Sequence, residues 1–532
     1  MKTKKILCMI LSFIMAMLTL SGCGSNKTGS EGEQANNLEI YILDAGYGTE
    51  WLKDIKDAFA KESWVQEKYP NLQIDISTNA EQSFAEGKIT AGAKANDFDI
   101  LFGVNLQTLF GKRGSDKQPY LADLTDVYEG TVPGEEVKVG DKLLESAKIA
   151  NQYTDLSGEA HYYSLPWAGG LAGVLYNADL LAEYGEVPVT TDQMLAIMAK
   201  ITKDRGYSII QSSNGTDGAC YWEHLYPTWW GQYEGYEGYM SFWNGQVNGE
   251  YSKDIFKQQG RLESLKTLEK VLGTKSKNLY ESSNALSFME AQTNFLMGNG
   301  VFMACGDWFD REMSVVKEGL KKEGYDFDIQ MMKTPVISSI INKTPSIKDD
   351  ATLAAVIKAV DNGETSYADV TAEDFAIIAE ARQIVFSVGN LHNAVVPEYS
   401  TSKDLAKDFL RYLATDTANE IYAKQTGGSG MFYKYDLQAK NPDLYKTLSG
   451  TARMRADFFS NSIYPAKVLP SPNNFNLFIY GGVRPLNATQ SNQFEILFTQ
   501  KNPKTAQEIF DADIKYWSDS VWSTVLVNIG AN

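Results

Sequence analysis

Aromatic side chains crowd one short segment of this 532-residue chain and equip it to bind a ligand. Ten of 23 consecutive residues there are aromatic, and the tryptophans among them are Trp222, Trp229, Trp230 and Trp243. Flat rings can stack on the C–H-rich face of a sugar while polar groups hydrogen-bond its edges. Glycine and glutamate interrupt the rings without a helical or strand period, so we expect an irregular loop beside a cleft. Packing in a core is the alternative for each ring taken alone.

The sequence contains few residues or motifs that could catalyse the breaking of a covalent bond. The sequence lacks a nucleophile elbow, an HExxH helix, a Walker loop and a CxxC pair. Its histidines are His161, His224 and His392, which we expect to be structural or exposed rather than metal ligands. Among 67 acidic residues some pair always suits glycoside hydrolysis, so a secreted carbohydrate-active enzyme is the alternative of a different class. We expect no catalysis, no metal and no cofactor.

The N-terminus carries an export signal. Three lysines precede an apolar run at residues 6–20, which is too short to span a bilayer comfortably. The run ends in Leu-Ser-Gly-Cys23, which resembles the bacterial lipobox and implies cleavage before Cys23 and diacylglycerol attachment to its sulfur. An ordinary signal peptide cut near Gly22 is the alternative. We expect residues 1–22 to be a lipoprotein signal peptide and residues 23–37, which are mostly polar, to be a flexible linker behind the lipid anchor.

Composition narrows the class of protein. A formal net charge of −18 without a long basic run makes nucleic acid an improbable partner. Hydrophobic residues make up 43% of the chain, and the roughly 495 residues after the linker exceed one ordinary domain, which favours two lobes. Apart from the signal and anchor cysteines, Cys220 and Cys305 remain, and we favour unpaired buried thiols over a disulfide.

Hydrophobic spacing predicts an α/β fold in the first part of the chain. Alternation predicts strands at 38–43, 72–76 and 98–104, and helical spacing predicts helices at 51–64 and 83–94. This order of elements is typical of a mostly parallel sheet with helices on both faces.

Polar and aromatic residues follow the predicted strands. Ligands gather at the carboxyl ends of such strands, where Tyr47, Glu50 and Trp51 follow the first strand and Asn105 follows the third. These four residues are therefore candidate ligand contacts. Simple solvation is the alternative for the polar ones.

Several segments in order carry a resemblance to a known family. They are YPNLQI at 69–74, NDFDI at 96–100, LADLTD at 121–126, YSLPW at 163–167, LYNADLL at 175–181, VPVTTDQM at 187–194, and residues 295–308 and 394–410. Together they resemble the extracellular solute-binding proteins of ABC importers, in the sugar-binding branch that includes maltose-binding protein. Thr191 departs from this pattern, which usually has tryptophan there.

The resemblance implies a two-lobe periplasmic-binding-protein-like fold of type II, with hinged α/β lobes and a ligand cleft between them. The first crossing is expected near 168–172, a return near 286–297 and a third passage near 391–396. The expected division is 38–168 and 294–391 for the N-terminal lobe, the latter with a helical surface insertion at about 340–382, and 169–293 and 392–532 for the C-terminal lobe.

The resemblance also implies a site and partners. Trp308 would stack on the ligand, Asp307 beside it would accept hydroxyl protons, and Trp167 at the first crossing would face the cleft. The partners would be a mono- or oligosaccharide and the ABC permease subunits. The protein would be a monomer outside the cytoplasm, lipid-anchored to the bacterial cell membrane. A peptide or a polyol is the alternative solute.

Overall fold

The computed structural model describes residues 36–44, 46–115, 117–154, 159–211, 221–387, 392–431, 433–460, 463–471, 475–484 and 502–531. The expected signal peptide, the expected lipid-attachment residue Cys23 and Cys220 lie outside the described residues, as does the side chain of Trp222. Cys305 is buried and carries a free thiol. Contacts group residues 35–532 into one compact unit.

A five-stranded sheet organises the first lobe, with strand order β2-β1-β3-β13-β6. Its strands are β1 (Asn37–Leu43), β2 (Gln73–Asn79), β3 (Ile100–Val104), β6 (Leu165–Ala168) and β13 (His392–Val395). β1 pairs in parallel with β2 and β3, which confirms the predicted β-α-β-α-β order, whereas β13 runs antiparallel to β3 and β6.

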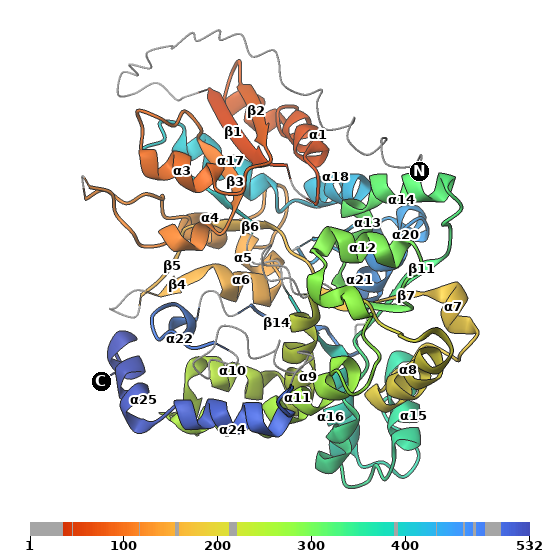
Figure 1. Ribbon diagram of the computed structural model, residues 1–532. Coiled ribbons are helices and arrows are strands. Elements are labelled where there is room, and N and C mark those ends of the chain that lie inside the picture. The colour runs from red at the N-terminus through yellow and green to blue at the C-terminus, as the bar shows by residue number, and fades with distance from the viewer. Residues whose placement is uncertain are drawn as a thin grey trace, which may run out of the picture. The chain divides into compact units, whose positions relative to one another are not determined.

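Helices cover both faces of this sheet (Figure 1). Successive residues of β1 join buried clusters on opposite faces, because Ile40 and Ile42 share a cluster with α1 while Tyr41 and Leu43 share one with α3. The helices and short strands of this region are α1 (Glu50–Phe59), α2 (Ser63–Lys68), α3 (Phe84–Ala91), η1 (Leu106–Leu109), α4 (Thr125–Glu129), α5 (Val139–Lys142), α6 (Glu145–Asn151), β4 (Gln152–Thr154), β5 (Ala160–Tyr162), α17 (Lys403–Tyr412) and α18 (Asp416–Thr426).

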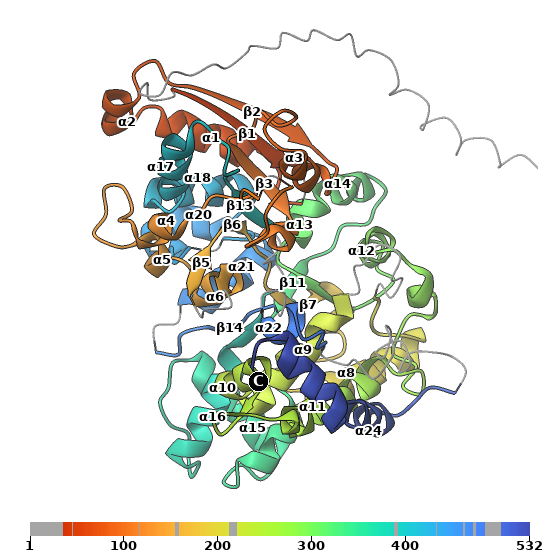
Figure 2. The same ribbon diagram turned by 90° about the vertical axis from the view of Figure 1, so that its left-hand side faces the viewer.

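The second lobe is built around a three-stranded antiparallel sheet, β10-β7-β11. These strands are β7 (Ala172–Asn177), β10 (Phe302–Gly306) and β11 (Ile329–Met332), and a parallel pair, β12 (Ile384–Phe386) with β14 (Lys467–Leu469), lies beside them. Figures 1 and 2 both show α8, α11, α15, α16 and α24 gathered in the lower part of the molecule.

The other elements after β7 follow in chain order. They are α7 (Ala178–Ala182), α8 (Thr191–Arg205), η2 (Tyr221–His224), α9 (Leu225–Glu234), α10 (Tyr236–Asn244), β8 (Gln246–Val247), β9 (Glu250–Tyr251), η3 (Lys253–Lys257), α11 (Gln259–Leu272), η4 (Glu281–Ala285), α12 (Phe288–Leu296), α13 (Phe309–Glu312), α14 (Ser314–Lys322), η5 (Ser338–Lys343), α15 (Asp350–Asp361), α16 (Ala372–Gln383), α19 (Leu437–Lys440), α20 (Pro442–Lys446), α21 (Gly450–Ser460), α22 (Asn476–Ile479), α24 (Ala506–Tyr516) and α25 (Asp519–Asn528). Among the described residues, these helices and those of the first lobe are all too short or too polar to cross a membrane.

The strand pairing divides the later chain differently from the expectation. The first passage lies at 168–172, between β6 and β7, and another lies between β12 and β13. However, 294–391 contributes β10 and β11 to the second sheet, and 392–532 opens with β13 in the first sheet. The segment 294–391 therefore belongs to the second lobe and the opening part of 392–532 to the first, because a strand belongs to the sheet in which its hydrogen-bond partners lie. The later part of 392–532 lies in the second lobe, as expected, since β14 pairs with β12 and α24 joins the buried cluster of that lobe. The expected return near 286–297 is the helix α12.

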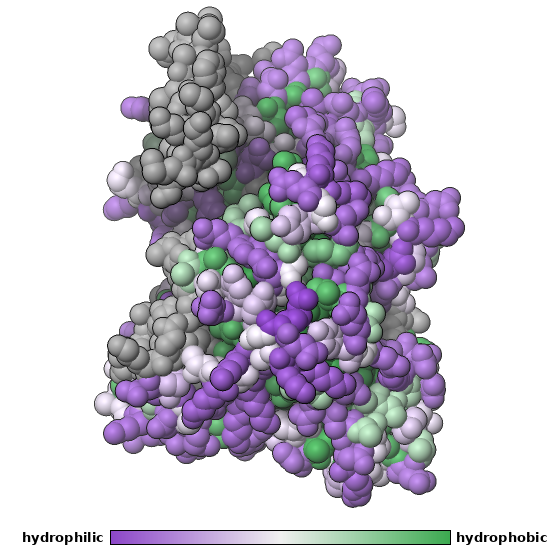
Figure 3. Space-filling view, turned by 45° about the vertical axis from the view of Figure 1, so that its right-hand side comes forward, coloured by the Kyte–Doolittle hydropathy of each residue, from purple (hydrophilic) through white to green (hydrophobic). Residues whose placement is uncertain are grey.

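The segment at 340–382 is helical, as expected, but it is not a surface excursion. Leu353 and Ile357 of α15 and Phe375 and Ile378 of α16 belong to the largest buried cluster of the second lobe. Because these helices bury apolar side chains against the body of the lobe, they form part of its core. The face of the molecule in Figure 3 is mostly hydrophilic, with apolar residues scattered over it.

The aromatic segment forms η2 and the two helices α9 and α10, so the expected irregular loop was wrong. Trp229 and Trp230 are fully buried, and Trp243 stacks on Phe475 with 5.4 Å between ring centroids. Trp229 Nε1 donates to the carbonyl of Pro335 at 3.0 Å. A helix that is apolar all round shows little periodicity and is buried on every side. These three rings are therefore core residues in this structure and do not line a cleft.

Burial of Trp229 gives a testable consequence. Replacing it with alanine should lower the free energy of unfolding by about 3–5 kcal/mol, because a large buried ring is lost and the cavity only partly closes. Urea denaturation followed by circular dichroism measures the change. Val315→Ala on α14, at a site that is 82% exposed, is the control and should shift stability by no more than about 0.5 kcal/mol. A loss below about 1 kcal/mol for Trp229→Ala would contradict the core position.

Candidate functional site

A buried ion pair joins the segments that link the two lobes. Asp307 follows β10, Arg455 lies on α21, and Nη1 of the arginine is 2.5 Å from Oδ2 of the aspartate. Arg455 also donates to the carbonyl of Gly169 at 3.1 Å and to that of Met431, while Asp307 Oδ1 accepts the backbone N–H of Leu171 at 3.2 Å. One pair thus holds the β6–β7 connection, the end of β10 and the loop after α18 together.

Asp307 was expected to accept hydroxyl protons of a ligand, and the structure gives it other partners. Its side chain is fully buried, and both carboxylate oxygens accept hydrogen bonds from the protein. Burial raises the pKa of Asp307, and the Arg455 guanidinium opposes that effect. These contacts indicate a structural role, because little of the carboxylate is left for a ligand.

Trp308 lies where the two lobes meet. Its half-buried ring packs against apolar clusters of both lobes and lies edge-on to Tyr221, with ring centroids 5.5 Å apart. It rests on the backbone of Gly170 and Gly306, where an added Cβ would lie 2.2 Å and 1.8 Å from ring atoms. Only glycine permits this close approach. His224 completes the edge-on contacts, at 6.1 Å.

The first lobe contributes a second aromatic group. Trp167 contacts His392 edge-on at 4.9 Å, His392 contacts Tyr47 at 5.2 Å, and Trp51 stacks on Trp167 at 5.4 Å. Tyr47, Trp51 and Trp167 are all buried. The structure therefore brings these predicted residues together, but mainly as packing partners of one another.

The remaining predicted contacts, Glu50 and Asn105, are exposed. Glu50 is exposed and forms a surface pair with Lys53 at 2.7 Å, and Asn105 is exposed at the carboxyl end of β3. Such polar loop residues match the switch-point placement that predicted them, but within the described chain they have no buried partner. Their assignment as ligand contacts stays a prediction.

Two polar residues of α13 face the first lobe and were missed by the sequence analysis. A Cβ added to Gly46 would lie 3.8 Å from Oε1 of Glu312, and one added to Gly48 would lie 2.6 Å from Nη2 of Arg311. Glu312 Oε2 accepts a hydrogen bond from Nε2 of Gln292 at 2.8 Å. The only feature of the sequence that could have indicated Arg311 and Glu312 is their position, since both follow Trp308 within about one helical turn.

Both histidines near these rings are neutral at pH 7. Burial lowers the pKa of His224 to about 3 and that of His392 to about 4. Within the described ranges no group of three or more His, Cys, Asp or Glu side chains is arranged to hold a metal. The polar and aromatic groups around Trp308 are thus rings, the amide of Gln292 and the carboxyl group of Glu312.

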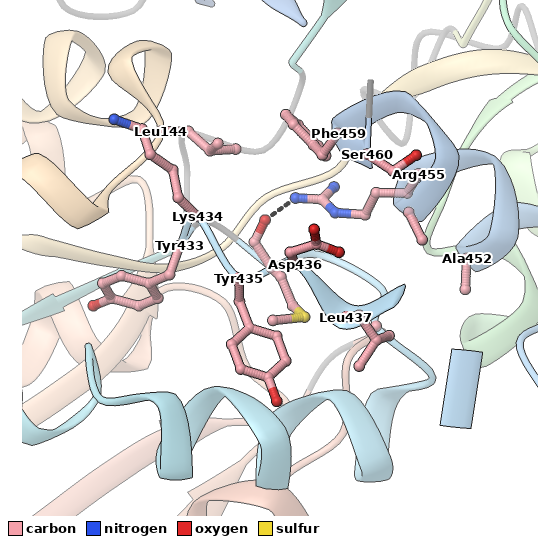
Figure 4. Close-up of a pocket in the computed structure, with 13 residues that line it drawn as sticks. Leu144, Tyr433, Lys434, Tyr435, Asp436, Leu437, Ala452, Arg455, Phe459 and Ser460 are labelled. Atoms are coloured by element: carbon pink, nitrogen blue, oxygen red, sulfur yellow. Dashed lines mark hydrogen bonds between the residues drawn. The ribbon is translucent and has the colours of Figure 1, made fainter. Parts of the chain in front are cut away.

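A cavity of about 220 Å³ lies beside the ion pair. Figure 4 shows Arg455 reaching from α21 to a backbone carbonyl at its centre, with Leu144, Phe459 and Ser460 around it. Arg455 is already engaged by Asp307, so the buried cation in this wall is not available to a solute. The junction around Trp308 is the better candidate site for a polar ligand.

Comparisons with known proteins agree on one family. The family model described as "Bacterial extracellular solute-binding protein" matches residues 45–420. None of the curated protein sequences matches the chain significantly.

Solved structures show the same fold at low sequence identity. A probable secreted solute-binding lipoprotein from Streptomyces coelicolor has a TM-score of 0.57 and 13% identity, over 92% of this chain and 99% of that one. An ABC substrate-binding protein from Listeria monocytogenes in complex with cycloalternan has a TM-score of 0.53 and 14% identity, over 93% and 99%. A chitin oligosaccharide binding protein has a TM-score of 0.53 and 13% identity, over 92% and 99%.

The role assigned to Asp307 can be tested by Asp307→Asn. This change leaves Arg455 as a buried charge without its counterion and should lower the free energy of unfolding by about 3–5 kcal/mol in urea titrations. Asp443→Asn is the matched control, because it removes an aspartate from an exposed pair with Lys446, with 93% and 72% of the side chains exposed. The control should change stability by less than about 1 kcal/mol. Equal stability of the two variants would contradict the structural role.

Proposed function

Because the chain belongs to the bacterial extracellular solute-binding protein family, we propose that it captures a mono- or oligosaccharide outside the cytoplasm and delivers it to an ABC importer. The observation that carries the sugar assignment is the position of Trp308 between the two lobes, with Tyr221 edge-on to it. Such a ring offers a flat apolar surface to the C–H face of a sugar ring.

Polar groups beside Trp308 support the same assignment. Glu312 lies one turn after Trp308 on α13 and is bonded to Gln292 on α12, and the two side chains can accept and donate hydrogen bonds to hydroxyl groups. Two similar folds are named for carbohydrates, a chitin oligosaccharide binding protein and a protein solved with cycloalternan. We propose no chemistry on the solute, because Asp307, the second buried carboxylate at the junction, is paired with Arg455.

The anchoring proposal concerns the N-terminus. We propose that Cys23 carries a diacylglycerol group and that the linker at 23–37 tethers a monomeric body to the membrane, within reach of the permease. Each buried methylene contributes about 0.8 kcal/mol, so two or more acyl chains hold a protein stably at a bilayer.

The sugar assignment predicts the behaviour of Trp308→Ala. Isothermal titration with a panel of mono- and oligosaccharides should show saturable binding to the wild type, and the variant should bind about 10- to 100-fold more weakly because the stacking surface is gone. Tyr251→Ala, at a half-exposed ring on β9, is the control and should bind like the wild type. Analysis of the sugars after incubation decides between the functions, since hydrolysis products would contradict a transport role. A panel without any binding sugar would overturn the carbohydrate assignment.

The anchoring proposal predicts the fate of Cys23→Ser. In the native bacterium this variant should leave the membrane fraction and lose the incorporation of labelled fatty acid, since the sulfur that accepts the lipid is absent. Cys305→Ser, which alters a buried thiol, is the control and should stay at the membrane. Membrane association and labelling that survive Cys23→Ser would show that the protein is anchored in another way.

A further inference from the structure

Glu312 is a half-buried acid that no cation of the described chain compensates. Its carboxyl group lies on α13, the short helix that follows Trp308, and forms no ion pair with the described residues. Burial raises the pKa of Glu312, while the hydrogen bond from Gln292 acts to lower it. An acid that is partly removed from water and has no cation beside it lowers the stability of the fold. Its presence at the junction between the lobes therefore points to a functional role.

One oxygen of Glu312 is held and the other is available. Oε2 accepts from Gln292 Nε2 at 2.8 Å, and the same amide nitrogen lies 3.4 Å from the hydroxyl of Tyr221. Oε1 accepts no hydrogen bond within the described chain and faces the loop of Gly46, at the carboxyl end of β1. Gln292 Oε1 is buried and also has no partner among the described residues.

The surroundings of Glu312 favour a solute with hydroxyl groups. Oε1 of Glu312 and Oε1 of Gln292 are both hydrogen-bond acceptors, so each can accept a hydrogen bond from a donor on a solute. Trp308 lies one turn before Glu312 on the chain, and the N–H of Glu312 donates to the carbonyl of Trp308 at 2.9 Å. A ring and an acceptor fixed to the same turn can engage the face and the edge of one sugar ring together.

Glycines on the first lobe permit the approach of α13. Gly48 has φ +68°, and the guanidinium of Arg311 occupies the space where its Cβ would stand. The loop 46–48 and α13 therefore form two sides of one contact, with Glu312 between them.

We propose that Glu312 is the carboxylate with which the site recognises hydroxyl groups of its solute, and that Gln292 positions it. The proposal rests on the carbohydrate-binding function proposed above and names the polar group of that same site. The carboxylate form accepts hydrogen bonds from solute hydroxyls, and at a pH below the raised pKa of Glu312 its carboxyl group gives its proton to the solvent on binding. No other reactant is needed.

The proton released sets the direction of the pH dependence. In the empty protein the pKa of Glu312 is raised, and hydroxyl donors in the complex lower it, so solute affinity is highest above the raised pKa and falls as the pH decreases through it. The titratable and charged groups around Glu312 are Tyr47 on the first-lobe loop, Cys305 on β10, Tyr221 on η2 and Arg311 on its own helix. Burial raises the pKa of Tyr47 and of Cys305 well above their ordinary values, which keeps both neutral. Glu312 is therefore the group that changes charge.

The test compares Glu312→Gln with Glu318→Gln. Glu318 lies exposed on α14, and its variant removes the same charge away from the site. Titrations with the saccharides that bind the wild type, at about pH 5 and about pH 8, should show wild-type affinity falling at the lower pH. Glu312→Gln should bind about 10- to 100-fold more weakly at the higher pH and lose the pH dependence, whereas Glu318→Gln should match the wild type.

The variant Gln292→Leu tests whether Gln292 positions Glu312 or only supports the fold. It removes the hydrogen bond that lowers the pKa of Glu312, so the pH at which affinity is lost should move upward, a shift that a purely structural role would not cause. Heats of binding in two buffers of different ionisation enthalpy should report proton release for the wild type and none for Glu312→Gln. Wild-type affinity in Glu312→Gln, or an unchanged pH dependence, would overturn this inference alone. A wild type that binds no saccharide would overturn the proposed function as well.

Discussion

The contact between Asp307 and Arg455 is the constraint on which the rest of the molecule depends. Two charges removed from water are stable together only when their geometry is close and their other hydrogen-bonding groups are satisfied. Here the arginine also reaches the carbonyls of Gly169 and Met431, and the aspartate accepts the N–H of Leu171. The partners come from segments far apart in the chain, 148 residues in the case of the pair itself. Breaking the pair would therefore loosen the β6–β7 connection, the end of β10 and the loop after α18 together.

The same pair fixes the position of the candidate site. Trp308 follows Asp307 directly, and its ring is confined by the backbone of Gly170 and Gly306. The helix α13 starts at the next residue and carries Glu312 toward the first lobe. Ring and acid thus stand on one rigid base, and this arrangement gives a binding site its precision because its parts cannot move independently.

The sequence predicted what depends on local pattern and missed what depends on distant partners. The first three strands and their helices were confirmed, since alternation and helical spacing are local properties of strands and helices. Trp229 and Trp230 were misjudged because an aromatic helix buried on all sides has no polar face to reveal its period. The engagement of Asp307 by Arg455 could not be read from residues so far apart. Glu312 carried no motif, and only its burial against Gln292 distinguishes it from the other acidic residues.

The place of β13 in the first sheet has a consequence for how the chain is made. β6 joins that sheet only through β13, which is formed by His392–Val395. A ribosome must therefore synthesise about three quarters of the polypeptide before the sheet can close. Until then β1, β2 and β3 can pair with one another, but the outer edge of β3 stays open, and an open strand edge can pair with another chain.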